Sequence, residues 1–194
     1  MDNNEFLFWN SSKIIEAYTK KDLSPVEVIK ASLEQSQEIQ KECNAFTEFF
    51  YVNSIKLAKI AEENYLNKSE NLKLLEGVPF GVKEEFALRG SSRTSASKIF
   101  KNRKDNHTDV YINRILIGGA IPIFKTTTPE FCLLGTTWSD LHGVTTNPWN
   151  NKYTPRGWSG GSGTALATGA CAIASGSDIV GSIRVPAAAC GVFG

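Results

Sequence analysis

Glycine and serine are concentrated in the stretch from Thr154 to Gly194, which holds nine of the chain's sixteen glycines. Glycine lets the backbone adopt conformations in which several N–H groups converge on one point and form an anion-binding nest. A hydroxyl beside such a nest provides what acyl transfer needs, a nucleophile and donors for the oxyanion. The alternative is a segment that only lets helices pack closely, and composition alone favours it.

Two serines in the later part of this stretch each follow a glycine that frames the hydroxyl, and we treat them as candidate nucleophiles. Gly176 precedes Ser177, and Gly181 precedes Ser182. Further upstream, three glycines at 160, 161 and 163 precede a run of small residues at 164–174 that we predict to be helical.

Composition excludes several classes of protein. The formal net charge is +1, with 21 basic and 20 acidic side chains, so there is no basic footprint for direct nucleic-acid binding. The N-terminal segment MDNNEFLFWN has no cationic signal region, and no apolar run is long enough to span a membrane. Widely spaced cysteines predict free thiols in a reducing compartment, so we expect a cytoplasmic protein. They are Cys43, Cys132, Cys171 and Cys190.

Local patterns predict an α/β fold. Ser24, Pro25 and Glu27 match the N-cap, N1 and N3 positions of a capping box, which predicts a helix to about Lys41. A predicted helix that ends at Gly118 and is followed by a predicted strand is typical of α/β layers. We expect one domain over 1–194, without repeats or linkers. The other predicted helices are 13–20, 53–65, 109–117 and 129–134, and the predicted strands are 45–52, 77–85 and 120–125.

No histidine suits the role of general base. Gly157–Gly161 (GWSGG) matches a serine nucleophile motif, but that motif needs a preceding strand and a downstream histidine. No strand is predicted before it, and His107 and His142 both lie upstream in surroundings typical of solvated side chains. No dinucleotide fingerprint or phosphate-binding loop is present either.

Lysine is the remaining type of base, and it acts as one only where burial favours its neutral form. Lys83 lies on the predicted strand 77–85 (GVPFGVKEE), where it shares a face with Gly81. Glu84 points to the other face, whereas Glu85 shares the face of Lys83 and would oppose loss of its proton. Taken alone, such a lysine is more often a surface residue.

Six blocks in this order resemble the amidase signature family: GVPFGVKEEF, RGSSRTSAS, KTTTPEF, NPWN, SGGSGTALATGA and GSDIVGSIRVPAAACGVFG. That family includes fatty-acid amide hydrolases, bacterial amidases and the amidotransferase subunit that makes glutaminyl-tRNA. The resemblance covers nearly the whole chain. It implies a mixed sheet covered by helices and hydrolysis of carbon–nitrogen bonds in a small-molecule amide substrate. It implies no metal or organic cofactor, and it leaves a homo-oligomer open.

The resemblance also implies a Lys–Ser–Ser triad. Lys83 corresponds to the base and Ser182 to the nucleophile that forms the acyl-enzyme. The backbone N–H groups of Ile179, Val180 and Gly181, with that of Ser182, would form the oxyanion hole. Val180 departs from the family pattern, in which this position is usually glycine.

A larger departure lies at the family's relay serine, which normally passes the proton between lysine and nucleophile. Trp158 occupies this position, and its indole N–H is only a donor. We expect its bulk to fill the space between Lys83 and Ser182. Ser159 would substitute only if the loop shifted.

Family members are considerably longer than this chain, whose apolar end at 185–194 predicts an N-terminal part with an incomplete sheet and pocket. Two alternatives to an impaired hydrolase remain open. One is a catalytically inactive amidase-like remnant or binding scaffold, and the other is an amidotransferase subunit that works with protein partners.

Overall fold

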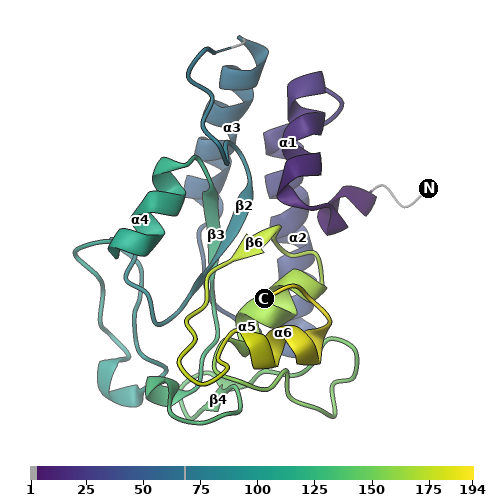
Figure 1. Cartoon of the computed structure of the whole chain (residues 1–194). Coiled ribbons are helices and arrows are strands. Elements are labelled where there is room, and N and C mark those ends of the chain that lie inside the picture. Colours follow the sequence, from purple (N-terminus) through teal and green to yellow (C-terminus); the bar gives the residue numbers. More distant parts are fainter. Residues whose placement is uncertain (1–3, 68) are drawn as a thin grey trace.

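The computed structural model describes residues 4–67 and 69–194, and Figure 1 shows how helices surround a small central sheet. The α-helices are α1 (Ser11–Lys20), α2 (Pro25–Cys43), α3 (Tyr51–Leu66), α4 (Val110–Ile117), α5 (Gly160–Ala167) and α6 (Arg184–Cys190). The strands are β1 (Phe46–Phe49), β2 (Pro79–Lys83), β3 (Ile121–Thr126), β4 (Trp138–Ser139), β5 (Gly143–Val144) and β6 (Ile173–Ala174). Short 3-10 turns are η1 (Glu5–Phe8), η2 (Lys98–Phe100) and η3 (Glu130–Cys132).

The main sheet is mixed, as predicted, with strand order β1-β3-β2-β6. β2 runs parallel to both neighbours, and β1 runs antiparallel to β3. Lys83 pairs with Thr126, and Gly81 pairs with Ala174. Because parallel strands end at the same edge of a sheet, the residues that follow β2, β3 and β6 meet there.

The capping box at the start of α2 is confirmed. The Ser24 hydroxyl accepts hydrogen bonds from Val26 N at 3.0 Å and Glu27 N at 3.4 Å. The Glu27 carboxylate in turn accepts from Ser24 N at 2.9 Å. This arrangement satisfies N–H groups that a helix start otherwise leaves without partners, which fixes the entry of the helix against α3.

The predicted helix over 164–174 is wrong in its bounds, because α5 begins at the glycines and ends at Ala167. A Cβ atom at Gly161 would lie 2.4 Å from Thr127 N, and one at Gly160 would lie 2.1 Å from Thr137 Oγ1. Close packing therefore requires these two glycines, as the plainer interpretation of the composition held. Gly169 then turns the chain with φ of 69° before β6.

Other predicted boundaries also shift. The strand predicted over 45–52 ends at Phe49 and α3 begins at Tyr51, because Phe50 leaves the extended conformation with φ of −110° and ψ of 39°. The glycine with positive φ after α4 is Gly119 rather than Gly118. The segment 129–134 forms only a 3-10 turn, because Phe131 has a left-handed φ of 51°.

The core lies on both faces of the sheet. Ile29 and Leu33 of α2 and Ala58 of α3 pack with Phe124 of β3 and Ala165 of α5 in the largest buried cluster. A second cluster joins β2 to α4 on the other face, through Phe80, Val82, Ile112 and Ala120. β2 is buried along its whole length, so its last residue is held rigidly.

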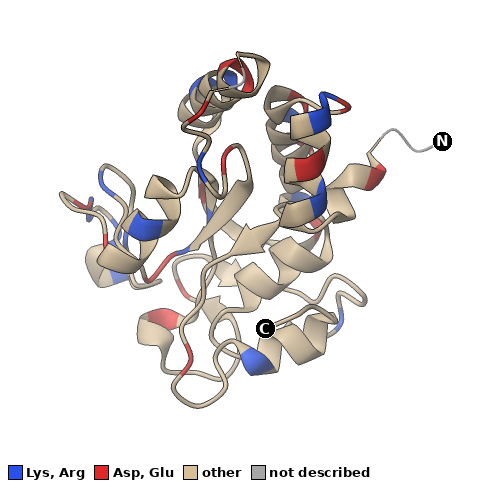
Figure 2. Ribbon diagram, turned by 45° about the horizontal axis from the view of Figure 1, so that its top comes forward, with Lys and Arg blue, Asp and Glu red and all other residues tan. Residues whose placement is uncertain are grey.

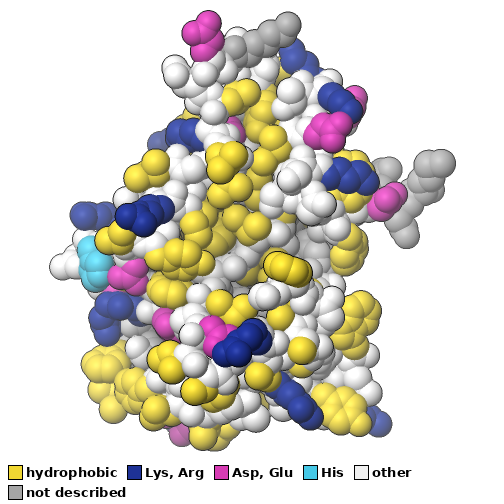
Figure 3. All heavy atoms as spheres, in the orientation of Figure 1, with side chains coloured by type: hydrophobic (Ala, Val, Ile, Leu, Met, Phe, Trp, Pro, Cys, Tyr) yellow, Lys and Arg dark blue, Asp and Glu magenta, His cyan; other side chains and the backbone are white. Residues whose placement is uncertain are grey.

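The surface carries charges of both signs, which Figure 2 shows spread over the outer helices and loops rather than gathered into one field. Helix α5 contains no charged residue. Figure 3 shows apolar side chains in a band across the face that carries β6. Exposed members of α4 include Val110, Tyr111 and Ile117, with 70%, 45% and 65% of their surface exposed.

Candidate active site

Lys83 ends the buried strand β2 and is fully buried itself. Its backbone N–H donates to Ser175 Oγ at 2.7 Å, which fixes the strand end beside the segment after β6. Gly81 makes this approach feasible, because a Cβ there would lie 2.8 Å from the Phe124 ring. Ser162 Oγ of α5 donates to Ser175 O at 2.9 Å and so anchors the same segment.

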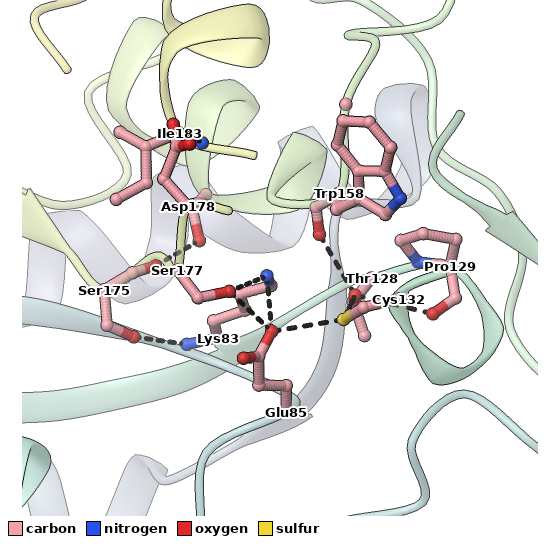
Figure 4. A network of polar contacts seen from close by, with 12 residues as sticks. Lys83, Glu85, Thr128, Pro129, Cys132, Trp158, Ser175, Ser177, Asp178 and Ile183 are labelled. Carbon is pink, nitrogen blue, oxygen red and sulfur yellow. Dashed lines mark hydrogen bonds and ion pairs between the residues drawn. The ribbon is translucent and has the colours of Figure 1, made fainter. Parts of the chain in front are cut away.

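The Lys83 amine contacts one carboxylate and one hydroxyl (Figure 4). Lys83 Nζ lies 2.5 Å from Glu85 Oε2 and donates to Ser177 Oγ at 2.8 Å. The same Glu85 oxygen accepts from Ser177 Oγ at 2.9 Å and from Cys132 Sγ at 3.1 Å. Lysine, serine and carboxylate therefore form a closed triangle, with the thiol at its outer edge.

The charges in this triangle shift the pKa values around it. Burial alone would raise the pKa of Glu85, but the hydrogen bond and charge of Lys83 outweigh it and hold that pKa below its ordinary value. Burial raises the pKa of the Cys132 thiol to about 11. The site thus holds an ion pair beside a protonated thiol.

The segment after β6 folds around the carboxylate of Asp178. Asp178 Oδ1 accepts from Gly181 N at 2.7 Å, and Oδ2 accepts from Ile183 N at 3.1 Å. The Arg184 guanidinium donates to both oxygens and, with these N–H groups, lowers the pKa of Asp178 well below its usual range. Gly181 has a φ of 107°, which this tight turn requires. The turn positions Ser182 on the same segment as Ser177, with 8% of its surface exposed.

The residues of the expected oxyanion hole lie on this turn. Ile179 and Val180 are exposed, with 90% and 68% of their surface open to solvent. The Gly181 N–H is already engaged by Asp178. One of the four expected oxyanion donors therefore already binds a carboxylate of the chain itself.

Trp158 lies near the triangle through its backbone, because its carbonyl accepts from Thr128 Oγ1 at 3.0 Å. Its indole ring points away from Lys83 (Figure 4) and lies over Gly135, where a Cβ would be 3.6 Å from the ring. The expectation that the indole fills the space between Lys83 and Ser182 is therefore wrong, because the ring does not lie against Lys83.

Ser159 is buried at the N-terminus of α5, and its hydroxyl has no hydrogen-bond partner among the described residues. It lies beside Gly176, where a Cβ would be 3.4 Å from Ser159 Oγ. The structure joins Lys83 to Ser177 instead, and no hydrogen bond links Lys83 to Ser182 within residues 4–67 and 69–194. The glycine pattern had drawn attention to Ser177, but nothing in the sequence indicated that Cys132 joins the site.

A second buried polar cluster lies on the other face of the β2 end. Glu84 accepts from Thr94 Oγ1 at 2.8 Å, and burial raises its pKa. Lys125 donates to Phe86 O at 2.5 Å, and burial lowers its pKa to about 8. His142 Nε2 lies 3.0 Å from Thr94 Oγ1, so the prediction of a solvated His142 is wrong, and burial lowers its pKa. These contacts hold the segment 91–105 against the sheet.

Metal-binding and membrane-spanning features are both absent from the described part of the chain. It contains no cluster of histidine, cysteine and carboxylate side chains that suits a metal ion. None of its helices is both long and apolar enough to cross a membrane.

The family model described as Amidase matches residues 27–194, and the chain belongs to this family. It is 34% identical over 179 residues to a glutamyl-tRNA(Gln) amidotransferase subunit from Trichormus variabilis, covering 92% of this chain and 37% of the relative. It is 33% identical to the corresponding subunit from Endomicrobium trichonymphae over 98% of this chain and 39% of the relative. The chain thus spans well under half the length of these curated relatives.

Solved structures agree with this assignment and with the mixed α/β fold. A fatty acid amide hydrolase matches with a TM-score of 0.90 and 25% identity, over 97% of this chain and 33% of the other. A 6-aminohexanoate cyclic dimer hydrolase in complex with its substrate matches with a TM-score of 0.87 and 28% identity, over 95% and 37%. At the level of the family, these relationships associate the fold with hydrolysis of amide carbon–nitrogen bonds.

Proposed function

We propose that this chain carries the lysine and serine of an amide-hydrolysing centre, in which Ser182 attacks the carbonyl carbon and Lys83 accepts its proton. One observation carries the proposal. The 2.8 Å hydrogen bond from Lys83 to Ser177 joins a buried strand-end amine to the segment that presents Ser182. Acyl transfer requires a base close to its nucleophile, and this bond supports the proposal by holding the base against the nucleophile's segment.

The reaction proceeds in two halves. Ser182 Oγ bonds to the carbonyl carbon while its proton moves toward Lys83, and the proton then goes to the leaving amine as the C–N bond breaks. Water hydrolyses the resulting acyl-enzyme. The N–H groups of Ile179, Val180 and Gly181 are the proposed oxyanion donors, and that of Gly181 must leave Asp178 to take part.

Two features reduce turnover in this proposal. Trp158 provides no hydroxyl at the family's relay position, and indole cannot both accept and donate a proton. Glu85 contacts the Lys83 amine at 2.5 Å and so competes with the serine hydroxyls for the base. We therefore expect a slow enzyme rather than an efficient one.

Hydrolysis of a short-chain acyl 4-nitroanilide tests the proposal. Trp158→Ser restores a hydroxyl and is expected to raise turnover by about 10²-fold or more, since one member of a catalytic unit commonly accounts for that much. Ser182→Ala in the same background should abolish the gain. An unchanged rate after Trp158→Ser would refute the relay assignment, and an active Ser182→Ala variant would refute the nucleophile.

The curated relatives support a second candidate, one component of an amidotransferase that works with protein partners. The support is the identity of 34% over 92% of the chain. A third candidate is an inactive binding scaffold, which the lost relay hydroxyl and the Lys83–Glu85 pair favour. Binding of a simple amide without turnover by the Trp158→Ser variant would select the scaffold over both enzymes.

A further inference from the structure

The proposed mechanism lacks one group, because Trp158 offers no hydroxyl to link Lys83 with Ser182. Ser159 does not replace it, since its hydroxyl is buried beside Gly176 without a hydrogen bond to Lys83. A relay needs a hydroxyl that accepts a hydrogen bond from one partner and donates to another. Among the described residues, the hydroxyl bonded to Lys83 Nζ is that of Ser177.

We propose that Ser177 is the proton relay of this chain and acts in place of the hydroxyl that Trp158 removes. This inference rests on the proposed function of Lys83 and Ser182. Ser177 Oγ already accepts from Lys83 at 2.8 Å and donates to Glu85 at 2.9 Å, so it uses both capacities of a relay. It is half-buried, which keeps it apart from competing bulk water while leaving it open on one side.

The backbone places Ser177 and Ser182 on either side of one tight turn. Asp178 follows Ser177 directly, and its carboxylate accepts from the N–H groups of Gly181 and Ile183, which flank Ser182. The Asp178 carboxylate therefore ties the residues on both sides of Ser182 to the residue that follows Ser177. The family's relay comes from the start of α5, whereas this relay comes from the nucleophile's own segment.

The proton balance is complete without any further reagent. The step starts with Lys83 as the neutral amine. Ser177 turns its hydrogen from Glu85 to Lys83 Nζ and takes the proton of Ser182 as the Ser182–carbon bond forms. Lys83 is then an ammonium, Ser177 is again a neutral hydroxyl, and the negative charge lies on the substrate oxygen. The same path in reverse delivers the proton to the leaving nitrogen.

Two substitutions of equal shape test this relay. Ser177→Thr keeps the hydroxyl, and Ser177→Val replaces it with a methyl group in an isosteric side chain. The rate at which a fluorophosphonate probe labels Ser182 is the readout. We expect Ser177→Val to lose about 10²-fold or more in rate and Ser177→Thr to stay within about 10-fold of the wild type. The Thr and Val variants should unfold at the same temperature. A difference in their labelling rates then comes from the hydroxyl and not from a change in packing.

A third variant gives a cross-check. Trp158→Ser restores the family's hydroxyl and is expected to rescue Ser177→Val, because the second relay then makes the first unnecessary. Equal labelling of the Thr and Val variants, or no rescue, would overturn the relay while leaving Ser182 as the nucleophile. Labelling of Ser182→Ala at the wild-type rate would instead overturn the proposed function itself.

Discussion

Replacement of Glu85 by glutamine tests whether the ion pair restrains the base. The Lys83–Glu85 contact is 2.5 Å long, and the lysine side chain is fully buried, so solvent screens this pair little. Glutamine keeps the shape and still accepts hydrogen bonds from Lys83 and Ser177. It removes the charge, and a hydrogen bond to a charged group contributes about 1.5–3 kcal/mol. Each ~1.4 kcal/mol is a factor of ten, so loss of this charged partner of Lys83 should raise the labelling rate about 10- to 100-fold.

The assay is the rate of fluorophosphonate labelling at neutral pH, where we expect Glu85→Gln to react about 10- to 100-fold faster than the wild type. Glu38→Gln is the matched control, since it removes one negative charge from an exposed ion pair on α2. Its rate should not change. A Glu85→Gln variant that folds and labels no faster would refute the idea that the contact with this carboxylate restrains Lys83.

The same substitution predicts a change in stability. Removal of one partner leaves Lys83 buried without a counter-charge, so the free energy of unfolding should fall by about 1–3 kcal/mol at pH 7. The folded-state pKa of Glu85 lies below its ordinary value, so its contribution is fully present above that value and is lost as the pH falls through the folded-state pKa. Urea unfolding of wild type and variant should therefore converge in acid. A constant difference down to pH 2 would contradict this linkage.

Three further predictions concern packing, capping and thiol chemistry. Gly161→Ala places a Cβ 2.4 Å from Thr127 N and should destabilise the fold by about 3 kcal/mol in urea unfolding, whereas an unchanged midpoint would show that α5 moves freely. Ser24→Ala should cost about 1 kcal/mol by removing the capping box of α2, and no loss would mean that the cap is dispensable. Burial raises the pKa of Cys132 to about 11 and of Cys171 to about 12, so iodoacetamide at pH 8 should alkylate them slowly until urea unfolds the chain. Equal rates with and without urea would contradict their burial.

The parts of the fold that could be predicted from the sequence are those that depend on interactions between neighbouring residues. The capping box of α2 needs only Ser24, Pro25 and Glu27, so it could be predicted from neighbouring residues alone. The bounds of α5 could not, because Gly160 and Gly161 are accommodated in a helix by contacts with Thr137 and Thr127, which lie far away in the sequence. Tertiary packing there overrides the low helix propensity of glycine.

The same distinction holds for the candidate site, where contacts between neighbouring residues could be predicted from the sequence and contacts between distant segments could not. Strand alternation placed Glu85 on the face of Lys83, and the structure brings these two side chains into contact. The partnership of Lys83 with Ser177 could not be predicted, because it depends on the pairing of β2 with β6. Cys132 reaches the site only through the left-handed backbone at Phe131, for which the sequence gives no signal.

Localisation of the covalent adduct tests the central claim most directly. The chain is treated with a fluorophosphonate and digested with trypsin, and the peptide between Arg156 and Arg184 is sequenced by tandem mass spectrometry. This peptide contains both Ser177 and Ser182, so fragment ions must distinguish them. The account predicts a single adduct on the Ser182 oxygen that is absent from Ser182→Ala. An adduct on Ser177, or no adduct at all, would contradict it.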